Sequence, residues 1–365
     1  MSTSLAIAQD WARAFSPPPK LSVSEWAEQH RRLPETAAAR GARWRNDWGP
    51  YLVAIMDAPL ERGVKQIAVE KCAQAGISEA LMNIIGYHVE HRPCAMLLVQ
   101  PTAGQAKDFS KDRLADAIRS TPSLRGIITD QRVPSDDGLP ESTQTMKMFP
   151  GGFLALAGGN SPNSVARWSV RIAMMDDADR LPRFVGAEGD PVQLLANRTT
   201  SFHDGFTIFV STPVLAGGRI DTLFGQGDQR RFHLPCVACG KWDWVAWKDE
   251  THWRVAFTDR KPDTARLVCP CGHEVREPER MELVRQGEWR PTAKPIAPGF
   301  VSFHLPAMVS PFVTLSGLVT KFLAAHMSGT PRKLREFVTT QLAEGWKDES
   351  QSLEPNELLA RMEDF

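Results

Sequence analysis

Two short segments contain residue types that could bind a nucleotide and its metal ion. In the first, residues 69–79 (VEKCAQAGISE), an apolar run passes through a loop into a helical pattern. At such a junction the loop N–H groups and the helix amino terminus can hold phosphate. The standard loop, G-x-x-x-x-G-K-S/T, would place its lysine at Ile77, whereas here Lys71 stands early. Gly76 and Ser78 are in register, and the Ser78 hydroxyl could serve Mg²⁺. An ordinary turn with a surface lysine is the alternative.

The second segment, residues 171–177 (RIAMMDD), is an apolar run that ends in two consecutive acids. At the carboxyl end of a parallel strand, beside a phosphate loop, one carboxylate can hold Mg²⁺ and the next can activate water. Asp176 would then be the magnesium-side acid and Asp177 the catalytic one. A solvated acidic turn after a buried strand is the alternative.

Two further polar positions lie near these segments in the sequence. Ser211 and Thr212 follow another apolar run, and their hydroxyls could contact the attacking water or the acidic pair; a strand-capping turn is the simpler explanation. Arg198 could supply positive charge to the γ-phosphate, in cis or in trans. A surface or ion-paired arginine is the alternative.

Four cysteines have the spacing of a metal site. Cys236-x-x-Cys239-Gly is one half of a zinc ribbon, and Cys269-Pro-Cys271-Gly is a second half shortened by one residue. Four thiolates would join hairpins too small to bury a core, so the zinc would be structural. His273 could replace Cys269 as a ligand, and a reduced site without metal is the alternative. We expect the neighbouring tryptophans to pack the ribbon rather than stack on bases: Trp242, Trp244 and Trp247.

The elements that must position these residues follow from apolar periodicity. Short apolar runs alternate with helical patterns, which predicts an α/β fold with a mainly parallel sheet covered on both faces. The runs are Gln66 to Val69, Ala95 to Val99, Phe153 to Ala157, Ile172 to Met175 and Phe206 to Val210. We divide the 365 residues into a lead-in (1–60), a core (61–225), a zinc-ribbon-like insertion (226–299) and a helical segment (300–365).

Composition excludes several classes of protein. Lysine and arginine together number 43, as do aspartate and glutamate, so binding of nucleic acid through a basic tail is excluded. Residues 31–45 nevertheless hold five arginines against one glutamate, and they could contact a DNA backbone or be a solvated segment. The apolar runs are too short to span a membrane. The closely spaced cysteines indicate a reducing compartment, the cytoplasm.

The ordered set of motifs resembles the large subunit of lambda-type phage terminases, from about residue 20 to the end. The motifs are KCAQAGISE, LLVQPTAGQAKDFSKDRL, GGFLALAGGNSP, RIAMMDDADR, LANRTTSF, VSTP, the cysteine-rich insert and LAEGW. In that family the phosphate-loop lysine also sits early, as Lys71 does here. The family usually has Asp-Glu where this chain has Asp176-Asp177, so the position of the catalytic carboxylate differs.

The resemblance implies a P-loop ATPase of the additional-strand type with a zinc-ribbon insertion, which drives double-stranded DNA into a capsid. Its cofactors would be ATP, Mg²⁺ and Zn²⁺. Trp44 and Tyr51 stand where the family places an aromatic ring against adenine, although core packing is an equal alternative. Expected partners are DNA, the terminase small subunit, the procapsid portal and further copies in a ring, in the host cytoplasm and away from membranes. The implied nucleotide-binding loop residues are Gln74, Gly76, Ile77, Ser78 and Glu79.

Two rival functions remain open at this point. LLVQPTAGQAKD also resembles superfamily 2 helicases or remodelling ATPases, and a zinc-ribbon adaptor with a degenerate loop would bind DNA without catalysis. Terminases of this kind also cut DNA with a following nuclease domain, but after LAEGW only a short polar tail remains, with Glu354, Glu357, Glu363 and Asp364. We therefore expect the ATPase portion of a longer protein, which hydrolyses ATP without cleaving DNA.

Overall fold

The computed structural model describes residues 20–35, 41–128, 142–160, 162–182 and 189–347. A single mixed sheet runs through them in the order β11-β10-β9-β8-β7-β13-β1-β6-β5-β2-β4-β3, with β12 beside β7. Seven neighbouring strands from β7 to β4 are mutually parallel. No helix among the described residues is long and apolar enough to cross a membrane.

The five apolar runs expected to be strands all form strands of this sheet. They are β1 (Gln66–Lys71), β2 (Ala95–Gln100), β4 (Gly152–Gly158), β5 (Ile172–Met175) and β6 (Phe206–Ser211). Every residue of β5 and β6 is buried, as expected for parallel strands covered on both faces. The short β3 (Met146–Phe149) pairs antiparallel with β4 at the sheet edge. The prediction of a mostly parallel α/β sheet is confirmed.

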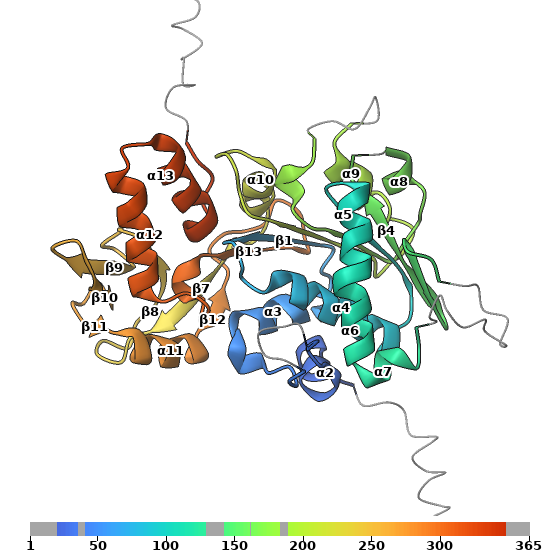
Figure 1. Ribbon diagram of the computed structural model, residues 1–365, viewed down its shortest axis with the longest axis horizontal. Helices are drawn as coiled ribbons and strands as arrows, with labels where there is room; N and C mark the ends of the chain where they lie inside the picture. The colour runs from blue at the N-terminus through green and yellow to red at the C-terminus, as the bar shows by residue number, and fades with distance from the viewer. Residues whose placement is uncertain (1–19, 36–40, 129–141, 161, 183–188, 348–365) are drawn as a thin grey trace, which may run out of the picture.

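Helices cover both faces, so that side chains from alternate strand positions enter two separate cores (Figure 1). One core contains α2 (Val23–His30), α3 (Tyr51–Asp57) and α4 (Ile77–His91). The crossover from β2 adds α5 (Ala103–Asp108), a π-helical turn (Phe109–Leu114), α6 (Ala115–Ser120) and α7 (Pro122–Arg125). The opposite face bears α8 (Pro162–Ala166), α9 (Pro191–Ala196) and α10 (Arg219–Gln226).

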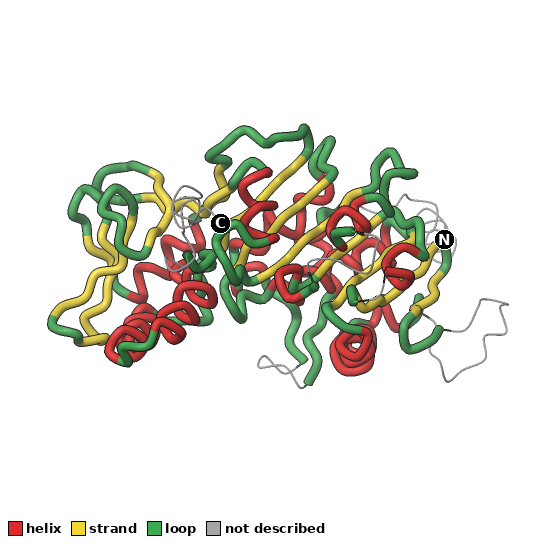
Figure 2. The backbone as a smooth tube through the Cα atoms, turned by 90° about the horizontal axis from the view of Figure 1, so that it is seen from above, coloured by secondary structure: helices red, strands yellow, loops and turns green. Residues whose placement is uncertain are grey.

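The insertion extends the main sheet at one end of the molecule (Figure 2). It comprises β7 (Arg230–Pro235), β8 (Trp242–Ala246), β9 (Trp253–Thr258), β10 (Lys261–Val268), β11 (Glu274–Val275), α11 (Glu277–Gln286) and β12 (Glu288–Arg290). Its tryptophans make packing contacts: Trp244 lies 3.7 Å from the His252 ring, and Trp242 lies under the Arg290 guanidinium. Trp247 packs on Phe322 and Phe337, which fixes the insertion against the C-terminal helices.

One part of the sequence-based division differs from the structure. Residues from 300 onward were expected to be helical, but β13 (Phe300–Leu305) is a buried strand parallel to β1 in the core sheet. The expected helical pattern is present further on, as α12 (Leu315–Met327) and α13 (Pro331–Phe337). A second π-helical turn (Val338–Leu342) then leads to Trp346, which pairs with Leu215 after β6.

Candidate functional site

The candidate site is a cavity of about 490 Å³ at the carboxyl edge of the parallel strands, which we call the sheet-edge cavity. Lys71 ends β1, Thr212 follows β6, Asp176 follows β5, and Gln100 ends β2. Since β1, β6, β5 and β2 are consecutive neighbours, their ends bring these four side chains to one place. The lining residues are Lys71, Ala73 to Glu79, Gln100, Gln105, Asp108, Phe109, Asp112, Arg113, Asp176, Asp177, Arg180 and Thr212.

The loop between β1 and α4 has the backbone of an anion-binding turn. Gln74 and Gly76 have positive φ angles of 58° and 78°, and Gly76 is the N-cap of α4. The left-handed region favours glycine at the cap. No side chain caps this helix end, so its first N–H groups face the cavity without a competing acceptor from a cap. Ile77 supplies only backbone here, since its side chain is buried in the core.

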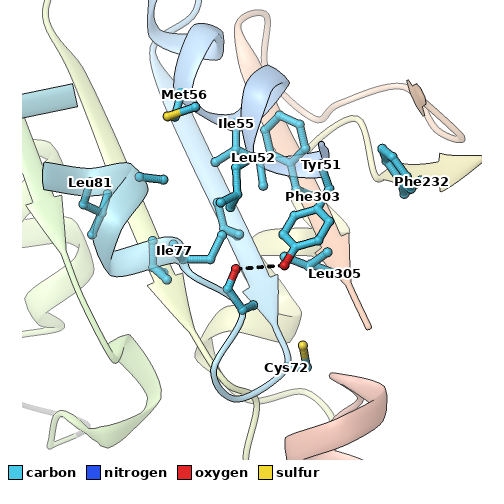
Figure 3. Close-up of a cluster of buried hydrophobic side chains, with 14 of the residues drawn as sticks. Tyr51, Leu52, Ile55, Met56, Cys72, Ile77, Leu81, Phe232, Phe303 and Leu305 are labelled. Atoms are coloured by element: carbon cyan, nitrogen blue, oxygen red, sulfur yellow. Dashed lines mark hydrogen bonds between the residues drawn. The ribbon is translucent and has the colours of Figure 1, made fainter. Parts of the chain in front are cut away.

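Hydrogen bonds with three neighbouring segments fix the position of this loop. The Cys72 N–H donates to the Leu305 carbonyl of β13, and the Ala73 N–H donates to the Thr340 carbonyl, each at 2.8 Å. The Tyr51 hydroxyl donates to the Ala75 carbonyl at 3.2 Å (Figure 3). The loop is therefore bonded to β13, to the π-helical turn at 338–342 and to α3.

Lys71 and Asp176 both line the cavity, and each is hydrogen-bonded to a neighbouring side chain there. The Lys71 Nζ donates to the Thr212 Oγ1 at 3.3 Å. The Asp176 Oδ2 accepts from the Ser78 Oγ and from the Gln100 Nε2, each at 3.4 Å. Two oxygen ligands of one Mg²⁺ lie about 3 Å apart. The Ser78 and Asp176 oxygens therefore fit that ion, and the predicted convergence of Lys71, Ser78 and Asp176 is present in the structure.

Burial of Asp176 raises its pKa above the ordinary value of 3.8, because the charged carboxylate is removed from water. The adjacent Asp177 raises the pKa further, while Lys71 acts in the opposite direction. A bound cation would stabilise the charged form of this buried carboxylate. Asp177 itself has a positive φ of 53° and lies 3.8 Å from the Arg180 Nε. A strained backbone at a non-glycine residue is common at functional sites.

Ser211 and Thr212 have separate roles. Ser211 is fully buried, and its Oγ accepts from the Asp179 N–H at 3.1 Å and donates to the Thr212 carbonyl at 3.0 Å. It therefore ties the end of β6 to the acidic turn, and only Thr212 lines the cavity.

Gln100 at the end of β2 and four polar residues on the helices that follow complete the cavity, although the sequence analysis assigned them no role. Gln100, Gln105, Asp108, Asp112 and Arg113 all lie in the motif LLVQPTAGQAKDFSKDRL. The four helical residues share one signal, their helical spacing after β2, which predicts an exposed helix face but does not predict the cavity that this face lines.

Glu79 lies at the cavity wall between two arginines. Arg113 donates to it at 3.2 Å and Arg31 at 3.0 Å. Arg31 is 1% exposed and also donates to the Arg32 carbonyl. Its guanidinium is therefore buried in hydrogen bonds within the protein and is not exposed for contact with DNA. The exposed Arg45 of the same basic stretch pairs with Asp47.

Three sequence-based assignments do not fit the structure. Arg198 donates to the Leu194 and Ala166 carbonyls, and its own carbonyl pairs with Val170 ahead of β5. It therefore lies at the amino edge of the sheet, so the cis reading is wrong, while the trans reading stays a prediction. Trp44 and Tyr51 are 5% and 0% exposed and do not line the cavity, so core packing is what the structure supports.

The four cysteines of the insertion meet at the tips of two hairpins. Their sulfurs all lie within 4.8 Å of one another, with Cys236 Sγ 3.7 Å from Cys271 Sγ and Cys239 Sγ 3.9 Å from Cys269 Sγ. Tetrahedral zinc with Zn–S bonds of about 2.3 Å separates sulfurs by about 3.8 Å. The four-cysteine set therefore fits a zinc ion, and His273 is outside this cluster.

With this geometry in place, the comparison with known proteins identifies the family. The profile described as "Phage terminase large subunit gpA, ATPase domain" matches residues 38–289. The chain belongs to this family. The terminase large subunit of Escherichia phage lambda is 27% identical over 354 residues, and that of Enterobacteria phage P21 is 26% identical over 353. Each alignment covers 91% of this chain but 54% and 53% of the relative, so the chain spans about half the length of these curated terminases.

Solved terminase structures are also similar to the chain. The Thermus phage P74-26 large terminase ATPase domain has a TM-score of 0.45 at 15% identity, covering 80% of this chain and 93% of that one. The HK97 bacteriophage large terminase has a TM-score of 0.42 at 11% identity, covering 55% and 39%.

A second profile, "Terminase large subunit gpA, endonuclease domain", matches residues 300–365. The described part of this range supplies β13 to the main sheet, and α12 and α13 to the packing of the insertion. It therefore forms one body with the terminase ATPase domain up to residue 347. Glu354, Glu357, Glu363 and Asp364 lie outside the described residues.

The buried Asp176 generates a prediction about stability. Because its folded-state pKa is raised, the folded state binds its proton more tightly than the unfolded chain does. The contribution of Asp176 to the free energy of unfolding therefore falls as the pH rises from about 3.8, the ordinary pKa of an aspartate, through the raised pKa of the folded state. Asp176→Asn should raise the midpoint of thermal unfolding by a few degrees at pH 7 in EDTA, and by less near pH 4.

The matched control is Asp112→Asn, which changes an exposed acid of the same cavity and should leave the midpoint nearly unchanged. Differential scanning calorimetry at the two pH values measures both variants. An unchanged or lower midpoint for Asp176→Asn at pH 7 would contradict the prediction.

Proposed function

We propose that the sheet-edge cavity binds ATP with Mg²⁺ and hydrolyses it, as a P-loop ATPase of the additional-strand type. The observation that supports this most is the convergence of Lys71, Ser78 and Asp176 at the ends of β1, α4 and β5. The strand order adds support, since β6 lies between the loop strand β1 and the acidic strand β5.

In this proposal each residue acts through its position. Lys71 and the loop N–H groups bind the β- and γ-phosphates, and Ser78 and Asp176 hold the metal. Mg²⁺ supplies positive charge against the phosphates when bound. Asp177 orients the attacking water and accepts its proton, while Thr212 holds Lys71 in the cavity. Catalysis rests on positioning and electrostatics, because phosphoryl transfer needs little covalent help from the protein.

Arg113 and Arg180 are the cavity's arginines, and we propose them in place of Arg198 as the source of charge within this chain. Arg180 makes only a long ion pair, 3.8 Å from Asp177, and is the more exposed of the two, whereas Arg113 pairs with Glu79 at 3.2 Å. Arg180 is therefore the better placed of the two to move toward a nucleotide.

We further propose that this ATPase is the motor part of a terminase large subunit, which drives double-stranded DNA into a procapsid. The proposed partners are DNA, the small subunit, the portal and further copies in a ring, in the host cytoplasm. Family membership supports this reading over a superfamily 2 helicase or a non-catalytic adaptor. Hydrolysis stimulated by linear duplex DNA would separate it from the adaptor.

Loss of the loop lysine should abolish most hydrolysis. Lys71→Ala is expected to lower the Mg²⁺-dependent ATPase rate at least tenfold, because a positive charge that contacts the phosphates is removed while the polar cavity keeps its fold. Lys107→Ala, an exposed lysine on α5 outside the cavity, is the control and should hydrolyse ATP at the wild-type rate. Phosphate release measured with and without linear duplex gives both rates. Near wild-type hydrolysis by Lys71→Ala would overturn the assignment.

We retain the prediction that this polypeptide does not cleave DNA. Nuclease chemistry needs carboxylates that hold two metals about 3.5 to 4 Å apart, and the acids that follow LAEGW stand in a short polar stretch of sequence without an apolar strand pattern to position them. Linear and supercoiled duplex should remain intact with Mg²⁺ or Mn²⁺. Products that vanish in Glu363→Ala or Asp364→Ala, but persist in Lys71→Ala, would favour the endonuclease match instead.

For the insertion at 226–299 we propose a zinc ribbon with one tightly held Zn²⁺. Gly240 and Gly272 follow the two cysteine pairs with φ angles of 71° and 89°, and their N–H groups donate to the Cys236 and Cys269 carbonyls. Each turn closes from a left-handed glycine back to the first cysteine of its pair, across four residues in the first turn and three in the shorter second one, which supports two cysteine turns that share one zinc ion. All four ligand positions are taken by cysteine, so the ion would be structural and closed to substrate.

Removal of one ligand should release this zinc and destabilise the insertion. Cys236→Ser is expected to contain much less than one Zn²⁺ per chain and to unfold at a lower temperature, because the remaining ligands cannot close the tetrahedron. Cys94→Ser, a buried cysteine outside the cluster, is the control and should keep its zinc. Metal analysis of chelator-free protein tests the prediction, and well-folded wild-type protein without zinc would reject it.

A further inference from the structure

A second group of side chains that could hold a metal ion, separate from the cysteine cluster, lies where the carboxyl ends of α2 and α4 meet. His30 is the last residue of α2, Glu90 is the penultimate residue of α4, and His91 is its last. One ligand atom from each lies within 4.8 Å of the others, and His30 Nδ1 is 3.9 Å from Glu90 Oε1. All three side chains are half-buried.

Close packing of the two helices brings these residues together. Trp26 of α2 is fully buried against Gly86 of α4, where a Cβ would lie only 2.2 Å from the indole. The same indole donates from its Nε1 to Glu90 Oε2 at 2.8 Å. That bond fixes one oxygen of the carboxylate and leaves Oε1 on the side of His30, as a second-shell donor does at many metal sites.

Aromatic neighbours also fix the two imidazoles. The His30 ring stacks on Trp26 at 6.1 Å with an interplanar angle of 19°, and the His91 ring stacks on Tyr87 at 5.5 Å with an angle of 20°. Both rings therefore lose little rotational freedom on binding a ligand, so that the site is pre-organised.

One ring nitrogen in the cluster has no partner that the structure describes. His91 Nε2 is shut off from solvent and makes no hydrogen bond to any described residue. An imidazole nitrogen that carries no proton has a lone pair available for a metal. A His30–Glu90 ion pair alone would leave this nitrogen unexplained.

We propose that His30, Glu90 and His91 bind one divalent transition metal ion of the zinc, cobalt or nickel type. Two imidazoles with one carboxylate suit these ions, whereas Mg²⁺ and Ca²⁺ take mostly oxygen ligands. Metal–ligand bonds of about 2.0 to 2.2 Å place tetrahedral ligands about 3.4 Å apart, so the side chains need to close by roughly 1 Å. A water molecule would complete the coordination, because the site is partly open.

The proposed ion would join α2 to α4, the helix that begins at the loop after β1. α4 starts at Ile77, directly after the Gly76 cap, and ends at His91. A ligand that binds only the folded arrangement raises stability according to its concentration and affinity. The ion would thus stabilise the packing of α2 on α4 without touching the sheet-edge cavity.

Cobalt provides the direct test. The 365-residue chain, with Zn²⁺ already in its cysteine site, is titrated with Co²⁺ and followed by visible absorption and by the midpoint of thermal unfolding. We expect one equivalent to bind, with d–d bands but no thiolate-to-cobalt band in the near ultraviolet, and to raise the midpoint. A thiolate band would place the cobalt in the cysteine cluster and overturn the proposal.

Variants separate this site from adventitious histidine binding. His91→Ala should weaken Co²⁺ binding at least tenfold, and Glu90→Gln should also weaken it while retaining an amide oxygen for the Trp26 N–H. His203→Ala removes a histidine that is 94% exposed and outside the cluster, and it should bind as the wild type does. Circular dichroism confirms folding of each variant. Equal Co²⁺ affinity in wild type, His91→Ala and Glu90→Gln would refute the site.

Discussion

The sheet-edge cavity depends on one constraint, the parallel pairing of β1 with β6 and of β6 with β5. Parallel neighbours end at the same edge, so Lys71, Thr212 and Asp176 meet although they are far apart in the sequence. The pairing requires both sheet faces to be covered, which explains the wholly buried β5 and β6 and the helices on each side. The same geometry places Arg198 at the wrong edge, because it precedes β6 instead of following it.

The buried carboxylate of Asp176 gives the cavity a negative charge that the surrounding residues only partly neutralise. Asp176 is buried beside Asp177, and the bonds from Ser78 and Gln100 only partly compensate its carboxylate. Glu79, by contrast, forms ion pairs with both Arg31 and Arg113 at the side of the cavity. A buried and incompletely paired carboxylate costs stability, and such a cost is common where a bound ion is needed for function.

Much of this could be predicted from the sequence because it depends on local pattern. Five apolar runs gave five strands, and residues at strand ends converged as parallel topology requires. β13 was missed because two polar residues, Ser302 and His304, interrupt its apolar run FVSFHL, although both are buried in the structure. The role of Tyr51 could not be decided from the sequence either. An aromatic residue ahead of a strand has the same sequence pattern whether it stacks on a base or, as here, donates a hydrogen bond to the Ala75 carbonyl of the loop.

The late position of β13 in the chain has a consequence for synthesis. During translation β1 can pair with β6 soon after residue 211 emerges, but its other edge stays open until the whole insertion has been made. That edge includes the Cys72 N–H and flanks the apolar Ile67 and Val69, so it is a template for pairing with other chains. A nascent chain that stalls before Phe300 would therefore be prone to aggregate, and a protein cut at that point should be recovered from inclusion bodies rather than as a smaller folded domain.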